Sequence, residues 1–266
     1  MFRRVVPQAL AEETLTQRSV KPAPRFHPRA GSSAAHQPAL EYQTREVISE
    51  YSLSAFKESP DNLHEFRQVI SVDGRQIRTA ESARHTLGMD LRSDDDRARK
   101  RMLEDFQKYG LAGAAADFGQ LILLFTKRQL HDYDFRVRGN DRIGADTAMV
   151  LHYEQRQGSV TFLVFEGRKT VRAKLDGDLW VRQGDALPLC ISIRSEWVEN
   201  RHRRRHDAIV EYARTPFGII APASVKHTEY FDDHLITENV FRYSPFRKFG
   251  ADAEIKFETG VETNSK

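Results

Sequence analysis

The sequence carries one conspicuous run of basic residues, RHRRRH, from Arg201 to His206. Guanidinium groups gathered in this way can bind phosphate or the acidic surface of a membrane. Firm phosphate binding usually needs several separated contacts, so we favour the alternative of a solvated turn between two strands. We therefore expect at most a weak contact with a membrane surface, through Arg201, Arg203, Arg204 and Arg205.

Two histidines of this run, His202 and His206, have the H-x3-H spacing of some zinc ligands. That spacing directs two imidazoles at one metal ion only on a helix, and this segment carries neither a helix signal nor a third ligand. The sequence therefore predicts no metal site, and we expect no cofactor.

Two other histidines could serve a hydrolase as a general base. His131 precedes Asp132 and Asp134 at the start of an expected strand, and His152 lies within another. A hydrolase also needs a nucleophile and an oxyanion hole, and no nucleophile-elbow motif accompanies either histidine. We therefore do not expect an enzyme, and the sequence assigns no catalytic residue.

The remaining reactive residue types have structural explanations. Asp94, Asp95 and Asp96 resemble a metal cluster, but they follow Ser93 and suit the first turn of a helix. Cys190 is the sole cysteine, so an internal disulfide is impossible. It lies in an expected strand, where a lone cysteine is usually inert.

Composition narrows the class of protein. A net charge of only +3 over 266 residues argues against a dedicated nucleic-acid binder. Hydrophobic residues make up 39% of the chain, with 16 Phe and 8 Tyr, which is enough for a core. The longest apolar run, LILLF at 121–125, is far shorter than the ~18 residues of a membrane-spanning helix.

The elements that position these residues are organised around the stretch 175–197, which contains both tryptophans, Trp180 and Trp197. Its second half alternates apolar and polar residues, as a strand with one buried face does. The apolar positions of that strand are Leu189, Ile191, Ile193 and Trp197. We expect this hairpin to anchor the core of an antiparallel sheet.

Earlier segments add a second hairpin and two helices. Alternation within 42–72 predicts two antiparallel strands joined around 59–62. Residues 93–130 break the alternation and predict amphipathic helices at about 94–110 and 114–130, with Ser93 as the first N-cap. Both helices should pack on one face of the sheet.

A succession of short strands and tight turns fills the remainder. The expected turns are Gly139-Asn140, Gln157-Gly158, Asp176-Gly177, Gly184-Asp185, Pro216-Phe217-Gly218 and Asp232-Asp233. Strands that follow one another without intervening helices form an antiparallel meander. We expect a single domain over 41–258, with a helical insertion at 93–130. Residues 1–40 should form a disordered or extended tail, and 259–266 a disordered one.

Several segments resemble an uncharacterised family of bacterial exported or envelope proteins. The resemblance covers about 42–258. It is carried by the helix with Asp117-Phe118-Gly119, the hairpin KLDGDLWVRQGDALPLCISI, the strand from Gly218 to Pro222, and the closing ENVFRYSPFRKF. That family is similar to the outer-membrane lipoprotein carrier and its lipoprotein-sorting relatives. The fold class it implies is α+β, mainly β: a strongly curved antiparallel sheet, or half-barrel, with two helices packed on one face.

The resemblance also implies a location in the periplasm or cell envelope, with a lipid or lipoprotein as partner. Members of the family normally begin with a cleavable signal peptide. The start MFRRVV is basic, but no apolar segment of about 7–15 residues follows it. No signal peptide is visible, and a cytoplasmic location stays open.

A ligand site would lie between helices and sheet, where apolar side chains gather on the concave face. The candidates are Phe66, Ile70, Phe118, Leu121, Ile122, Phe125, Leu189, Ile191, Ile193, Val210 and Tyr212. If helices and sheet part, these residues line a cleft for a lipid, an acyl chain or a lipoprotein segment. If they pack fully, they form a self-filled core, and the protein is a structural or interaction module without a ligand.

Overall fold

A computed structural model describes residues 8–21, 40–55, 63–93, 102, 104–106, 108–109, 111, 118, 121, 125, 130–156, 163–166, 169–172 and 174–248. Within them, one antiparallel sheet of twelve strands dominates, and two more strands form a separate hairpin. The strands are β1 (Gln8–Val20), β2 (Tyr42–Ala55), β3 (Leu63–Val72), β4 (Arg75–Gln76), β5 (Tyr133–Ile143), β6 (Asp146–Gln155), β7 (Leu163–Glu166), β8 (Lys169–Arg172), β9 (Lys174–Arg182), β10 (Pro188–Glu199), β11 (His202–Arg214), β12 (Ile220–Phe231), β13 (His234–Tyr243) and β14 (Arg247–Lys248). The helices whose bounds are fully described are α1 (Ala80–Ser93) and the short 3₁₀ helix η2 (Leu130–Asp132).

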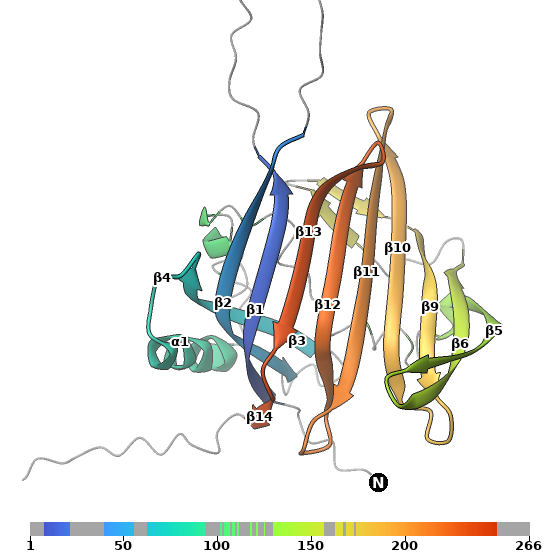
Figure 1. Cartoon of the computed structure of the whole chain (residues 1–266), viewed down its shortest axis with the longest axis horizontal. Coiled ribbons are helices and arrows are strands. Elements are labelled where there is room, and N and C mark those ends of the chain that lie inside the picture. Colours follow the sequence, from blue (N-terminus) through green and yellow to red (C-terminus); the bar gives the residue numbers. More distant parts are fainter. Residues whose placement is uncertain are drawn as a thin grey trace, which may run out of the picture.

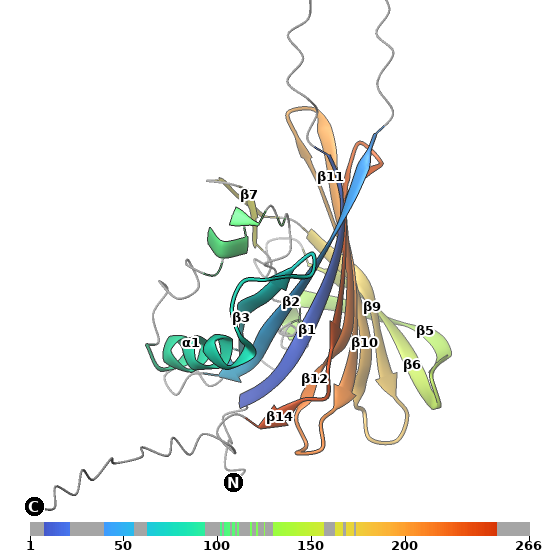
Figure 2. The same ribbon diagram turned by 60° about the vertical axis from the view of Figure 1, so that its left-hand side comes forward.

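The large sheet is open and curved, as the predicted half-barrel requires. Its strand order is β4-β3-β2-β1-β13-β12-β11-β10-β9-β6-β5, and β14 pairs with β1 beside β13. Figure 1 shows the long central strands side by side, and Figure 2 shows α1 and β7 on the same side of the sheet. The fold class predicted from the sequence is therefore confirmed.

One row of apolar side chains crosses the inner face of the sheet. Cross-strand partners lie on the same face, so the register defines this row directly. It passes through Ile191, Val210, Val225, Phe241, Leu15, Val47 and Val72. All seven belong to the main hydrophobic core, together with Met102, Phe106, Phe118 and Leu121 from the helical insertion. Burial of this row is what holds the insertion against the sheet.

Part of the expected N-terminal tail belongs to the sheet. Gln8–Val20 form β1, which pairs with β2 on one side and with β13 on the other. The prediction for 1–40 is wrong there because Glu13 and Gln17 lie at inward positions, where alternation normally shows apolar residues. Both are fully buried in polar contacts. Residues 22–39 and the expected C-terminal tail at 259–266 lie outside the described residues.

The structure contains a helix, α1, that the sequence analysis did not predict. α1 ends at Ser93, which was expected to start a helix, and Thr79 accepts a hydrogen bond from the Ser82 N–H at its N-terminus. The described residues of 94–110 are helical at 102, 104–106 and 108, as predicted. Within 114–130, Leu121 and Phe125 have 3₁₀ conformation and Phe118 is irregular. The described part of that segment is therefore not the continuous α-helix that was expected.

Two of the expected turns lie inside strands. Gly139-Asn140 belongs to β5, which bulges at this point against β6, and Asp176-Gly177 belongs to β9. A Cβ atom on Gly177 would lie 2.0 Å from the carbonyl oxygen of Ser192, so glycine is needed for close strand approach rather than for a turn. The turns at 184–185, 216–218 and 232–233 are confirmed, and 157–158 lies outside the described residues.

Candidate functional site

An apolar cleft opens at the end of the inner face near β5, β6 and β9. Its volume is about 390 Å³, within the range of roughly 300–1,000 Å³ that is usual for ligand sites. The described residues that line it are all apolar: Phe125, Leu130, Phe135, Leu151, Leu179, Val181, Ala186 and Pro188. Such a lining suits a hydrocarbon group and offers no side-chain hydrogen bond to a polar one.

The strands position these walls by simple alternation. Leu151 of β6 pairs with Leu179 of β9, which pairs in turn with Ile191 of β10. The cleft is therefore an extension of the apolar row across the core, toward β6 and β9. Leu130 is 42% exposed and Phe135 is 36% exposed, so apolar surface faces solvent at the cleft.

Aromatic rings form one end of the cleft. The ring centroid of Phe125 lies 4.8 Å from that of Tyr153, 5.5 Å from Tyr133 and 5.9 Å from Phe135. Tyr153 is fully buried and donates its hydroxyl hydrogen to the Ser192 carbonyl at 2.8 Å. Burial raises the pKa of Tyr153 far above its usual value, so this hydroxyl stays neutral.

The predicted ligand-binding residues fall into separate groups. Phe118, Leu121, Ile191, Ile193, Val210 and Tyr212 are packed within the main core, as the self-filled alternative expects. Of the eleven candidates, Phe125 alone is among the described residues that line the cleft. Ile122 lies outside the described residues.

Three candidates do not join this core because strand register moves them. Leu189 packs with Ala148 and Leu187 instead, beside a β-bulge between Pro188 and Cys190. A second irregularity, opposite Ile48 and Ser49, leaves Ile70 without a cross-strand partner in the ladder. Phe66 pairs with Ser52. It lies three residues before the core residue Val69, so the two side chains point to opposite faces of the strand. A bulge is not visible in a pattern of alternating residues.

The other lining residues were missed, although some left a signal. Leu151 in β6, and Leu179 and Val181 in β9, occupy alternate positions that mark one buried face. The sequence could have assigned them to the inner face. Their gathering around Phe125 and Pro188 depends on strand order, which no local pattern contains.

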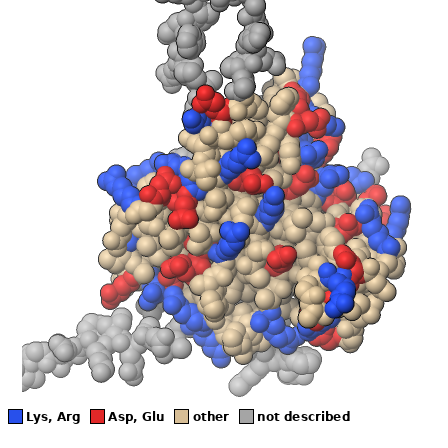
Figure 3. Space-filling view, in the orientation of Figure 1, with Lys and Arg blue, Asp and Glu red and all other residues tan. Residues whose placement is uncertain are grey.

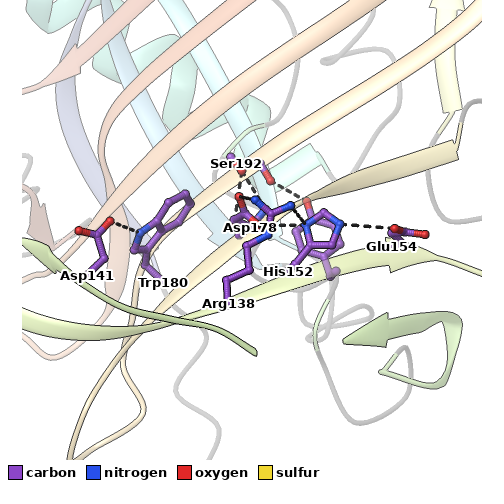
Figure 4. A network of polar contacts seen from close by, with 8 residues as sticks. Arg138, Asp141, His152, Glu154, Asp178, Trp180 and Ser192 are labelled. Carbon is purple, nitrogen blue, oxygen red and sulfur yellow. Dashed lines mark hydrogen bonds and ion pairs between the residues drawn. The ribbon is translucent and has the colours of Figure 1, made fainter. Parts of the chain in front are cut away.

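A polar network containing His152 lies on the opposite face of β6 and β9 (Figure 4). His152 Nδ1 lies 2.9 Å from Asp178 Oδ1, and its Nε2 lies 3.5 Å from Glu154 Oε1. The Ser192 hydroxyl oxygen accepts the backbone N–H of Asp178 at 2.8 Å. In a catalytic triad the second imidazole nitrogen would face the nucleophile. Here it faces a second carboxylate, so this arrangement does not support a serine hydrolase.

His131 fits no catalytic arrangement either. Its side chain is 74% exposed and lies 3.4 Å from Asp132 at the end of η2. The strand β5 begins immediately afterwards, which agrees with the predicted junction between helical and extended structure.

Most of the basic run is paired within the sheet. Residues His202–Arg205 begin β11, and the turn itself consists of Asn200 and Arg201. Arg205 lies 3.1 Å from Asp207 and over the ring of Tyr230, while Arg203 pairs with Asp233. Figure 3 shows basic and acidic side chains interspersed over the visible face of the molecule. These pairs weaken the case for an anionic surface as partner.

No helix among the described residues is long and apolar enough to span a membrane.

Comparisons with known proteins yield structural likenesses only. No family model matches the chain, and no curated protein matches it. A putative outer membrane lipoprotein-sorting protein domain from Vibrio parahaemolyticus is 9% identical; the match covers 93% of this chain and 87% of that chain, with a TM-score of 0.36. A DUF1329 family protein from Desulfovibrio piger is 13% identical; the match covers 96% of this chain and 90% of that chain, with a TM-score of 0.33. A LolA superfamily protein from Nitrosomonas europaea is 12% identical; the match covers 93% of this chain and 87% of that chain, with a TM-score of 0.30.

Proposed function

We propose that this chain is a non-enzymatic binding protein of the bacterial envelope that holds a hydrophobic group in the cleft beside Phe125. The ligand is a lipid, an acyl chain or the lipid-modified segment of a lipoprotein. The observation that carries this proposal is the cleft itself, whose described lining is apolar throughout and includes the exposed residues Leu130 and Phe135. Exposed apolar walls lose contact with water when hydrocarbon enters, and this burial is the driving force for binding.

A second candidate function rests on the packed part of the inner face. Phe118, Leu121 and Ile191 are buried in one core, so the described residues of the insertion pack directly against side chains of the sheet. A structural or protein-interaction module without a ligand would have such a core. The two functions differ in whether the cleft takes up a guest.

Titration with a fluorescent acyl probe distinguishes them. We expect saturable binding to the wild-type protein and a loss of at least about tenfold in affinity for Phe135→Gln, because the variant places an amide in the apolar wall. Val137→Gln is the matched control, since Val137 lies in the same strand, is 69% exposed and is not among the lining residues. Absence of saturable uptake by the wild type would support the module without a ligand.

Native mass spectrometry identifies the ligand class. Protein isolated from the membrane fraction of the source cells should carry a co-purified lipid, and Phe135→Gln should carry less of it. A ligand-free spectrum for the wild type, together with no probe binding, would exclude the carrier function.

A further inference from the structure

The inner face of the sheet changes character toward the β10–β11 turn, where polar side chains replace the apolar row. His206 of β11 is the register partner of Glu229 of β12, and His227 lies two residues before Glu229 on the same face. One ligand atom from each of these three residues can be chosen so that all lie within 4.8 Å of one another. The pairing of β11 with β12 thus brings the imidazole of His206 close to His227 and Glu229, which lie more than twenty residues further along the chain.

An aromatic ring packs against each histidine of this cluster. The indole of Trp197 lies 4.9 Å from the imidazole of His206, and the ring of Phe118 lies 5.2 Å from that of His227. His227 is 4% exposed, and the side chain of Glu229 is 19% exposed. The three groups therefore lie close together in a largely buried position, whereas most acidic residues of a protein surface are solvated.

Two buried polar atoms beside the cluster have no hydrogen-bond partner among the described residues: the hydroxyl of Ser195 and the indole nitrogen of Trp197. Ser195 is the register partner of His206, and Trp197 packs on the same imidazole. Buried polar atoms are almost always satisfied in folded proteins. A water molecule or anion held at the cluster by a bound cation would supply the missing partner.

We propose that His206, His227 and Glu229 form a binding site for a divalent transition-metal ion of the zinc class. Two imidazole nitrogens and one carboxylate oxygen are typical ligands for such an ion, and three protein ligands leave a position open for water. Ligand distances of about 2.0–2.2 Å place donors roughly 3.4 Å apart in a tetrahedral site.

The donor set suits a divalent cation, because two imidazole nitrogens are joined by one carboxylate. The carboxylate of Glu229 supplies the negative charge that partly balances the cation.

This site differs from the pair suggested by spacing alone. His202 points to Asp232, at 2.6 Å, and its side chain is 50% exposed. The H-x3-H pair in the sequence is therefore not the pair that converges, and His202 provides a matched control on the same strand.

Isothermal titration of metal-free protein with Zn²⁺ tests the proposal. The wild type should bind one Zn²⁺ per chain, and His206→Gln and Glu229→Gln should each weaken binding more than tenfold, while His202→Gln should bind as the wild type does. Circular dichroism shows whether each variant is folded, and Glu229, being partly exposed, offers the change least harmful to folding. Bound Co²⁺ should give visible d–d bands that Glu229→Gln alters.

Three results would overturn the metal site. They are the absence of stoichiometric Zn²⁺ binding by the wild type, unchanged affinity in a folded His206→Gln or Glu229→Gln protein, and equal loss in His202→Gln. The last would assign the ion to surface histidines.

Discussion

The guanidinium of Arg67 forms a buried ion pair with the carboxylate of Glu13. Arg67 Nε lies 2.8 Å and 2.9 Å from the two Glu13 oxygens, and Nη2 lies 2.9 Å from Glu65. The Arg67 guanidinium also lies 5.0 Å from the Tyr51 ring centroid. Burial, followed by the charge of Glu65, raises the pKa of Tyr51 well above its usual value. This cluster ties β1, which the sequence did not reveal, to β3 across β2.

Arg67→Met should therefore destabilise the protein strongly. The substitution leaves two carboxylates buried without their cation, and breaking a buried pair typically costs about 3–5 kcal/mol. Urea denaturation measures the loss of unfolding free energy. Arg194→Met is the control, since Arg194 pairs with Asp207 at 3.2 Å on the surface, where a pair contributes about 0–1 kcal/mol. Equal losses in the two variants would contradict the assignment of the Arg67 cluster as buried.

Ile191→Ala tests the apolar row. Ile191 is fully buried between Leu179 and Val210, and removal of its side chain should cost about 2–5 kcal/mol in unfolding free energy. Ile209→Ala on the neighbouring strand is the control, because Ile209 is 47% exposed and should lose less than about 0.5 kcal/mol. A loss at Ile191 as small as that at Ile209 would mean that the register is wrong.

Gly177→Ala should cost about 1–3 kcal/mol or more, as overpacking does. The new methyl group would lie 2.0 Å from the Ser192 carbonyl oxygen and 3.0 Å from the Tyr153 hydroxyl. Because the first clash is with backbone, removing the hydroxyl in Gly177→Ala/Tyr153→Phe should not restore the thermal midpoint. Restoration by that double variant would show that the hydroxyl, and not strand approach, requires glycine.

Cys190 should resist thiol reagents in the native protein. It is 4% exposed, and burial, followed by the charge of Glu211, raises its pKa to about 12. At pH 8 its reaction with a disulfide reagent should be at least about a thousandfold slower than that of an ordinary cysteine, because only the thiolate reacts. Unfolding in urea should restore the ordinary rate. Fast labelling without denaturant would contradict the burial of Cys190.

Many of the strands could be predicted because alternation is a local property. Ile191, Ile193 and Trp197 are separated by even numbers of residues, so they share one face of the strand, and all are buried as expected. The turn at Asp232-Asp233 was likewise recognisable, since both residues adopt positive φ angles that Asp tolerates better than most residues. The antiparallel meander follows from short connections of this kind.

The sequence by itself thus determined a mainly β, antiparallel fold whose buried faces can be marked residue by residue. Only the tertiary structure decided that Leu15 of β1 fills the row between Phe241 and Val47. It likewise decided that Leu151 and Leu179 border a cleft with Phe125, and that His206 meets His227 and Glu229. The physical reason is that side-chain direction is set within a strand, whereas contact is set by strand order, register and bulges. Those depend on how distant segments share one buried face.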